Sequence, residues 1–170
     1  MLSEKMTQAL NEQLTFELFS GHLYLSMAAF CASKDLDGFA NFFIIQEQEE
    51  RFHAMKFFHY VNEKGGDVKI YALEQPETEF AGIEEIFTKS LHHERIVTSR
   101  INDLMTLARE ENDYATQDFL QWFVREQVEE ESTLDSLLKK LQLIKGEGQG
   151  LLMLDEKLAA RQFTAPAVEE

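Results

Sequence analysis

Four long segments of the chain place apolar residues at intervals of three and four, which is the pattern of an amphipathic helix, and none of them contains a proline. The pattern predicts helices at about Lys5–Ser33, Gly38–Lys64, Ile83–Glu111 and Asp113–Lys145. A short fifth helix is predicted at about Leu151–Gln162, after a glycine-rich breaker at residues 146–150. Strand-like alternation is confined to residues 68–71. The fold class is therefore expected to be all-α.

The lengths of the connections predict how these helices are arranged. Very short links join the first helix to the second and the third to the fourth, and short links make antiparallel neighbours. The link Gly65–Gly82 could span about 60 Å when extended, and a helix of about 28 residues is only about 42 Å long. This link can therefore run the length of the bundle and leave the second and third helices parallel. We expect a four-helix bundle over residues 1–145, a linker and short helix over 146–163, and a flexible tail over 164–170.

The stripe that should face the core is interrupted by a glutamate in each of the four long helices. These glutamates are Glu17, Glu50, Glu94 and Glu130. At 1.5 Å per residue they lie about 16 to 26 Å from the same end of the bundle, so they fall in one layer within the uncertainty of the helix ends. A buried carboxylate is costly without a partner, so such a layer needs an explanation.

A bound cation would relieve the repulsion within this layer. His53 lies three residues after Glu50, so both side chains share one face of the helix. Carboxylate oxygens with one imidazole suit iron or manganese better than zinc or copper. The Glu-x-x-His pair alone is a weak signal because glutamate is abundant here, and the coincidence across four helices is the stronger one. The alternative is that the stripes are turned by one position and that the glutamates face solvent.

Other residues near the layer have two interpretations each. Glu49, Glu126 and Glu129 lie one position off the stripes, where they form either an adjoining metal site or a solvated acidic face. Tyr24 lies seven residues after Glu17 on the same face, as a plain core tyrosine or as a hydrogen-bond partner and electron donor beside the metal. The histidines without ligand-like spacing are expected at the surface or in satisfied positions: His22, His59, His92 and His93.

The amino-acid composition limits which classes of binding partner are expected for this chain. The formal net charge of −15 argues against binding to nucleic acid or to an anionic membrane surface, and no run of residues is apolar enough to span a membrane. Cys31 is the single cysteine, so no intrachain disulfide can form and a reducing cytoplasm is the expected location. Its apolar surroundings predict a buried, inert thiol.

Taken together, these residues resemble those of a known family. The set Glu17, Glu50-x-x-His53, Glu94 and Gln127-x-x-Glu130, with Tyr24, is similar to that of ferritins of the bacterial or archaeal non-haem type. The resemblance covers nearly the whole chain. It implies a ferritin-like four-helix bundle with one long crossover and a short fifth helix, assembled as a hollow homo-oligomeric shell of 24 subunits. It also implies a ferroxidase that oxidises Fe(II) with dioxygen or peroxide and stores the ferric mineral.

The resemblance also implies a role for each residue of the layer. Glu17, Glu50 and His53 would hold the first of two irons per subunit. Glu50, Glu94 and Glu130 would hold the second, with Glu50 bridging the two. Carboxylates stabilise Fe(III) over Fe(II), and an open coordination position admits oxygen, so the chemistry agrees with this assignment.

The residues that flank the layer receive roles from the same resemblance. Gln127 would lie beside the second iron through a hydrogen bond. Glu49, Glu126 and Glu129, with Glu130, resemble the third iron site of prokaryotic ferritins, which favours the metal interpretation of that group.

Related classes fit less well. Bacterioferritins have a second Glu-x-x-His pair where this chain has Gln127-x-x-Glu130, and a haem-ligating methionine where it has Arg51, so no haem is expected. Animal light-type storage subunits, which do not catalyse oxidation, lack the ligand set. Cytokine bundles usually have two crossovers and are secreted, and di-iron oxygenases are usually longer.

Overall fold

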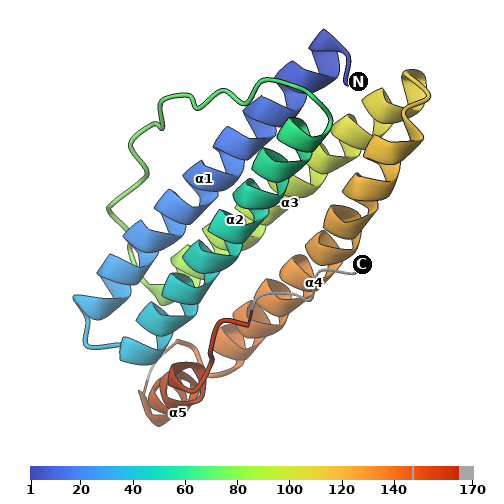
Figure 1. Cartoon of the computed structure of the whole chain (residues 1–170). Helices are drawn as coiled ribbons and strands as arrows, with labels where there is room; N and C mark the ends of the chain where they lie inside the picture. The colour runs from blue at the N-terminus through green and yellow to red at the C-terminus, as the bar shows by residue number, and fades with distance from the viewer. Residues whose placement is uncertain (147, 165–170) are drawn as a thin grey trace.

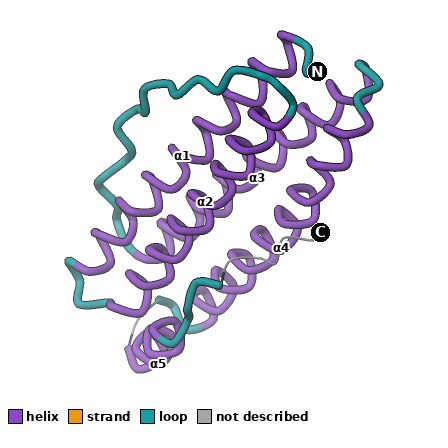
Figure 2. Tube along the Cα trace, in the orientation of Figure 1, coloured by secondary structure: helices purple, strands orange, loops and turns teal. Residues whose placement is uncertain are grey.

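The computed structural model describes residues 1–146 and 148–164, and these residues form five helices without a strand (Figure 2). The helices are α1 (Glu4–Ala32), α2 (Asp37–Glu63), α3 (Ile83–Glu110), α4 (Tyr114–Leu143) and α5 (Gly148–Ala159). The all-α prediction is confirmed, and the limits of the first four helices agree with the predicted ones to within two residues. The alternation at residues 68–71 lies in an irregular segment.

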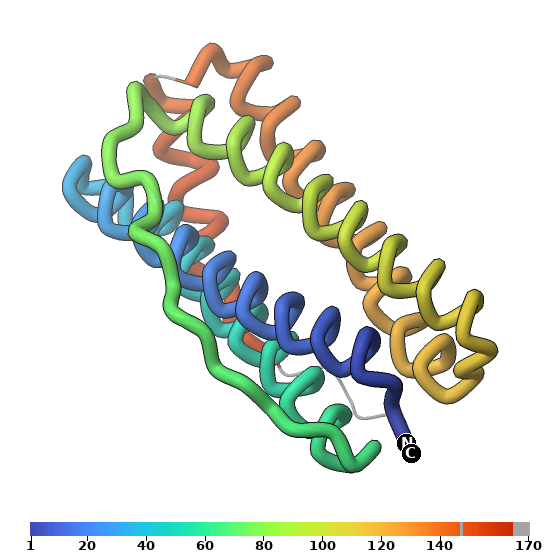
Figure 3. Tube along the Cα trace, turned by 90° about the horizontal axis from the view of Figure 1, so that it is seen from above, coloured from blue at the N-terminus to red at the C-terminus, as the bar shows by residue number. Residues whose placement is uncertain are grey.

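The crossover between α2 and α3 has the predicted course. This crossover segment, residues 64–82, leaves the end of α2, runs along the outside of α1 and reaches the start of α3 at the opposite end of the bundle (Figures 1 and 3). Asn11 of α1 fixes it, because its side-chain amide donates to the Asp67 carbonyl (2.9 Å) and accepts from the Lys69 backbone N–H (2.8 Å). The second and third helices are therefore parallel, as predicted from the length of the link.

The helix ends have recognisable local causes. The Ser3 hydroxyl caps α1 by accepting a 2.9 Å hydrogen bond from the first turn, and the Asp113 carboxylate caps α4 in the same way at 3.1 Å. The tight links after α1 and α3 turn at Asp35 and Asn112, both with φ of 55°. Asp and Asn tolerate this left-handed conformation better than other side chains.

α5 begins at Gly148, earlier than the start at about Leu151 that the sequence predicts. Residues 146–150 were expected to break the helix as a unit, but Gly148 and Gly150 lie in the first turn of α5. Gly146, with φ of 62°, makes the turn. A Cβ at Gly150 would lie 2.9 Å from the Ile144 side chain, so that glycine allows close packing and does not act as a breaker.

Two apolar clusters fill the bundle on either side of the glutamate layer. One cluster lies towards the α5 end and contains Tyr24, Phe42, Phe87 and Leu134; the other lies towards the N-terminus and contains Leu10, Phe57, Ile101 and Phe123. On each long helix the glutamate falls between residues of the two clusters. The polar layer is therefore sealed from both ends by packed side chains.

α5 lies at the end of the bundle where α2 begins and α4 ends (Figure 1). It packs closely on α2: a Cβ at Gly38 would lie 1.7 Å from the Asp155 carbonyl oxygen, and the Asp155 carboxylate accepts from the Phe39 backbone N–H at 2.9 Å.

The expected division of the chain at residues 145 and 163 stays a prediction, and the expected tail lies outside the described residues apart from Thr164. In the part of the chain that the structure describes, no helix is long and apolar enough to cross a membrane.

Replacement of Gly38 by alanine tests the contact between α5 and α2. The added Cβ meets backbone atoms, which cannot move aside as a side chain would. We expect Gly38→Ala to destabilise the protein by about 1 to 3 kcal/mol, measured by thermal unfolding. Gly82→Ala is the control, because its Cβ would meet nothing within 4 Å. Equal melting temperatures for the two variants would contradict the close packing.

Candidate metal centre

The four glutamates of the inward stripes lie in the interior, at the level between the two apolar clusters. Each has an exposed fraction of 5% or less. The interpretation in which the stripes are turned and the glutamates face solvent is therefore wrong. One carboxylate comes from each long helix, so the layer depends on the whole bundle and not on any single helix pair.

Three of the predicted ligands form a tight group. Single ligand atoms of Glu17, Glu50 and His53 all lie within 4.8 Å of one another, and all three residues are buried. His53 Nδ1 is 3.6 Å from Glu50 Oε2. Among the described residues, Glu17 Oε2 and Glu50 Oε2 are buried side-chain oxygens without a hydrogen-bond partner. Buried acceptors without a donor are costly, and a cation between them would satisfy both.

Glu94 lies in the same layer but is held by hydrogen bonds from two predicted neighbours. The Tyr24 hydroxyl donates to Glu94 Oε1, and Gln127 Nε2 donates to Glu94 Oε2 at 3.0 Å. Tyr24 is fully buried within the apolar cluster towards α5. It is thus both a core side chain and the hydrogen-bond partner that the spacing suggested.

Glu130 and Glu17 are each held by a glutamine that the sequence analysis did not include in the site. Gln46 Nε2 donates to Glu130 Oε2 at 2.9 Å, and Gln13 Nε2 donates to Glu17 Oε1 at 2.9 Å. Arg100 donates in turn to Gln13 Oε1 at 2.8 Å. Gln46 lies on the inward stripe of α2 and Gln13 lies four residues before Glu17 on α1, so both were readable signals. Arg100 meets Gln13 only in the folded bundle.

Burial and mutual repulsion shift the pKa values of the layer. The pKa of Glu50 is raised well above its ordinary value by burial and then by the charges of Glu94 and Glu17. Burial also raises the pKa of Glu17 and of Glu130, and it raises that of Glu94 to about 7 in spite of hydrogen bonds from its neighbours. Burial lowers the pKa of His53 to about 3. The imidazole is therefore neutral at pH 7 and offers a lone pair to a metal.

The predicted third-site residues are less enclosed. Glu49 and Glu126 are partly buried and Glu129 is exposed, so these three do not join the tight group. Burial raises the pKa of Glu49, and the charges of Glu126 and Glu129 raise it further. The Arg161 guanidinium opposes this shift by binding both carboxylate oxygens of Glu49. Arg161 comes from the segment after α5, and nothing in the sequence pattern linked it to the site.

The residues expected to lie outside the site behave as predicted. His22, His59 and His92 are exposed, and His93 is buried with its Nε2 2.7 Å from the Ser20 hydroxyl. Cys31 is fully buried, and burial raises the pKa of its thiol to about 12. A thiol that stays protonated is a poor nucleophile, which agrees with the inert role expected for Cys31.

Replacement of Glu94 by glutamine tests the electrostatic cost of the layer. The pKa of Glu94 is about 7 in the folded protein and near its ordinary value of 4.5 in the unfolded chain, so folding favours the protonated form. This contribution to stability is complete below about pH 4.5 and is lost as the pH rises through about 7. Between pH 5 and pH 8, the free energy of unfolding should fall by about 2 to 3 kcal/mol more in the metal-free wild-type protein than in Glu94→Gln.

Denaturant titrations at the two pH values measure this difference. Glu110→Gln, an exposed change on the same helix, is the control and should follow the wild-type protein. The same pH dependence in Glu94→Gln and the wild type would show that Glu94 does not hold a proton in the folded state.

Comparison with known proteins shows the family to which the chain belongs. The profile of the ferritin family, described as the ferritin-like domain, matches residues 7–144. The chain is 45% identical over 163 residues to the bacterial non-heme ferritin of Staphylococcus epidermidis, covering 96% of this chain and 98% of the relative. It is 42% identical to the bacterial non-heme ferritin of Staphylococcus aureus over the same shares of the two chains.

Solved structures agree with the sequence relatives. An engineered closed form of the Archaeoglobus fulgidus ferritin superimposes with a TM-score of 0.95 and 48% identity, over 96% of this chain and 100% of that one. An open pore ferritin from the same archaeon gives a TM-score of 0.94 and 47% identity, over 95% and 98% of the two chains. The chain therefore belongs to the ferritin family of iron-storage proteins.

Proposed function

We propose that this chain is the catalytic subunit of an iron-storage shell and oxidises Fe(II) at the buried carboxylate layer. The observation that supports this most directly is the group of Glu17, Glu50 and His53, with two buried oxygens that lack a hydrogen-bond donor. A neutral imidazole and carboxylate oxygens form a donor set suited to iron. The first Fe(II) substrate would bind to these three side chains.

The second Fe(II) would bind to Glu50, Glu94 and Glu130. The charges of Glu94 and Glu130 both raise the pKa of Glu50, which indicates that all three carboxylates share one electrostatic environment. Gln127 and Gln46 each hold one of these carboxylates with a side-chain amide. Neutral amide donors orient the carboxylates. They do not compete with the metal ion for the carboxylate oxygens, as a cationic side chain would.

The protein's contribution to the reaction is to hold anionic ligands in a dry layer. Two apolar clusters exclude water from either side, and four carboxylates favour Fe(III) over Fe(II). Each pair of Fe(II) ions gives two electrons to dioxygen or peroxide. Tyr24 donates a hydrogen bond to Glu94, and burial raises the pKa of Tyr24 well above its ordinary value. It therefore stays protonated beside the site.

The assembly is proposed to be a homo-oligomeric shell of 24 subunits without haem. The named relatives and solved structures are ferritins that match this chain over nearly its full length. Arg51 follows Glu50 and is exposed, so this position offers no haem ligand. A cytoplasmic location, expected from the single buried cysteine, stays a prediction.

Removal of the ligands tests the catalytic part of this proposal. We expect Glu17→Ala and Glu50→Ala to slow Fe(II) oxidation by at least about 10-fold, because each deletes a carboxylate ligand. The appearance of ferric iron is followed by absorbance after Fe(II) is mixed with the protein in air. Glu63→Ala, an exposed change at the end of α2, is the matched control and should oxidise iron at the wild-type rate.

The same measurement separates catalysis from passive storage. Unchanged rates in both ligand variants, with continued accumulation of soluble ferric iron, would favour a storage shell without a catalytic centre. That result would overturn the assignment of the layer and leave the membership of the family intact.

A further inference from the structure

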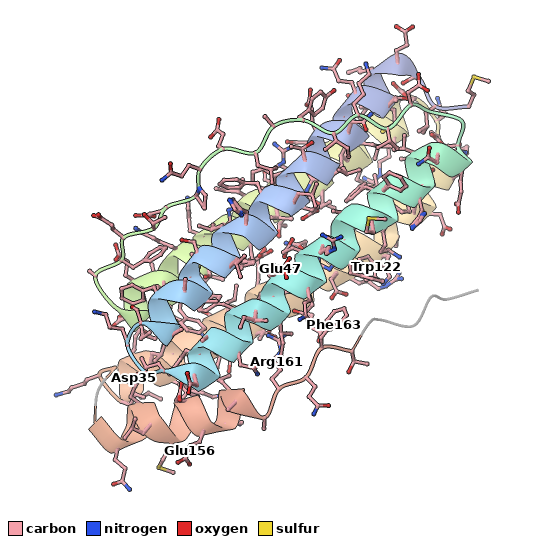
Figure 4. The ribbon with its side chains drawn as sticks, turned by 60° about the vertical axis from the view of Figure 1, so that its left-hand side comes forward. Asp35, Glu47, Trp122, Glu156, Arg161 and Phe163 are labelled. Carbon is pink, nitrogen blue, oxygen red and sulfur yellow. The ribbon has the colours of Figure 1, made fainter. Side chains whose placement is uncertain are left out.

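The segment that follows α5 turns back onto α2 beside the carboxylate layer. Figure 4 shows this segment, with Arg161 and Phe163, running alongside α2. Asn41 of α2 anchors its backbone, because the side-chain amide donates to the carbonyl oxygens of Leu158 (3.1 Å) and Arg161 (3.0 Å). The backbone of this segment is therefore held on α2 independently of the Arg161 side chain.

The Arg161 side chain contacts three residues, all on α2. Its Nη2 donates to both carboxylate oxygens of Glu49, at 3.0 and 2.9 Å, and its Nη1 donates to Gln46 Oε1 at 2.6 Å. The guanidinium carbon lies 4.7 Å from the centre of the Phe42 ring. Gln46 then donates to Glu130 at 2.9 Å. A continuous chain of hydrogen bonds therefore joins Arg161 to the buried layer.

The charge around Glu49 explains why a cation is held there. Glu126 and Glu129 face Glu49 closely enough to raise its pKa, and Arg161 counteracts them. The same guanidinium also lowers the pKa of Glu130. The ion pair uses both oxygens of Glu49, which a metal ion would need, through the single nitrogen Nη2.

The ion pair is accessible enough to be exchanged. The side chains of Arg161 and Glu49 have exposed fractions of 28% and 19%, so neither is locked in the core. A groove of about 480 Å³ lies beside Arg161, and Arg161, Glu129 and Ser132 are among its lining residues. A hydrated ion in this groove meets Glu129 and the Arg161 guanidinium, so it reaches Glu49 when the guanidinium withdraws into solvent.

We propose that Arg161 is an internal counter-ion of the Glu49 carboxylate, and that a third metal ion binds at Glu49, Glu126 and Glu129 only by displacing it. The proposal rests on the proposed function, because it concerns the order in which metal fills the centre. The competition makes the third ion the weakest of the three. It also makes that ion easy to expel, because the guanidinium returns to the oxygens that the metal leaves. Arg161 thus positions Glu49 and sets the affinity of the third site.

Titration of the assembled, metal-free protein with Zn²⁺ tests this competition without any redox step. Isothermal titration calorimetry is performed on the wild type, Arg161→Gln, Arg161→Lys and Lys157→Gln. We expect the third equivalent per chain to bind about tenfold more tightly in Arg161→Gln, and the first two equivalents to bind as in the wild type. Arg161→Lys keeps the charge without the forked donor, so its third affinity should lie between the two. Lys157→Gln removes an exposed charge from α5 and should match the wild type.

A double variant shows where the third ion binds. Adding Glu129→Gln to Arg161→Gln should abolish the gain, because Glu129 belongs to the proposed site. A gain that persists in the double variant would place the ion elsewhere and overturn the proposal. An unchanged third affinity in Arg161→Gln, an equal shift of all three affinities, or two equivalents without a third in every protein would also overturn it.

The affinity of the first two equivalents distinguishes a failure of the competition from a failure of the proposed function. If they bind tightly and only the third fails to respond, the competition is refuted and the di-metal centre stands. If no equivalent binds tightly to any of the proteins, the proposed function fails as well. Should Arg161→Gln not assemble, Arg161→Lys decides alone: a tighter third equivalent supports the proposal, and an unchanged one refutes it.

Discussion

The burial of four carboxylates in one layer is the constraint on which the rest of this structure depends. One glutamate comes from each long helix, and each is almost completely removed from solvent. Burial raises the pKa of all four, and the charges of other carboxylates add to the shift of Glu50, Glu94 and Glu130. Without a cation, the protein accommodates them by protonation and by hydrogen bonds from Tyr24, Gln127 and Gln46. An interior so unfavourable for charge does not stabilise the fold, and the proposed iron binding is the function that accounts for it.

The free energy that offsets the cost of burying these carboxylates comes from the packed regions on either side of the layer. Two apolar clusters occupy the ends of the bundle, and the crossover segment is fastened along α1 by Asn11. The crossover leaves α2 and α3 parallel, and this topology brings all four glutamates to one level. The layer is thus placed by long helices whose apolar packing lies on either side of it.

Much of this arrangement could be predicted from the sequence, and each exception has an identifiable physical cause. The helices and the buried stripes follow from the spacing of apolar residues, and the layer follows from the positions of Glu17, Glu50, Glu94 and Glu130 on those stripes. Gln13 was missed although it lies four residues before Glu17 on α1, a spacing that a helix brings side by side. Arg161 was missed because it lies outside the long helices and meets Glu49 only through tertiary packing. Gly150 of the breaker lies in α5 because its close packing on Ile144 requires a residue without a side chain. Periodicity predicts which face of a helix is buried, but not which distant side chain will meet it.

The most direct test of this account is a count of ferrous iron bound without oxygen. The metal-free protein is titrated anaerobically with Fe(II), and bound iron per chain is determined after removal of free metal. Air is then admitted, and the formation of ferric iron is followed. The account predicts two tightly bound Fe(II) per chain, oxidised at once when oxygen enters, with further soluble ferric loading after that. No tight binding, or oxidation no faster than in buffer, would show that the buried carboxylate layer is not an iron centre.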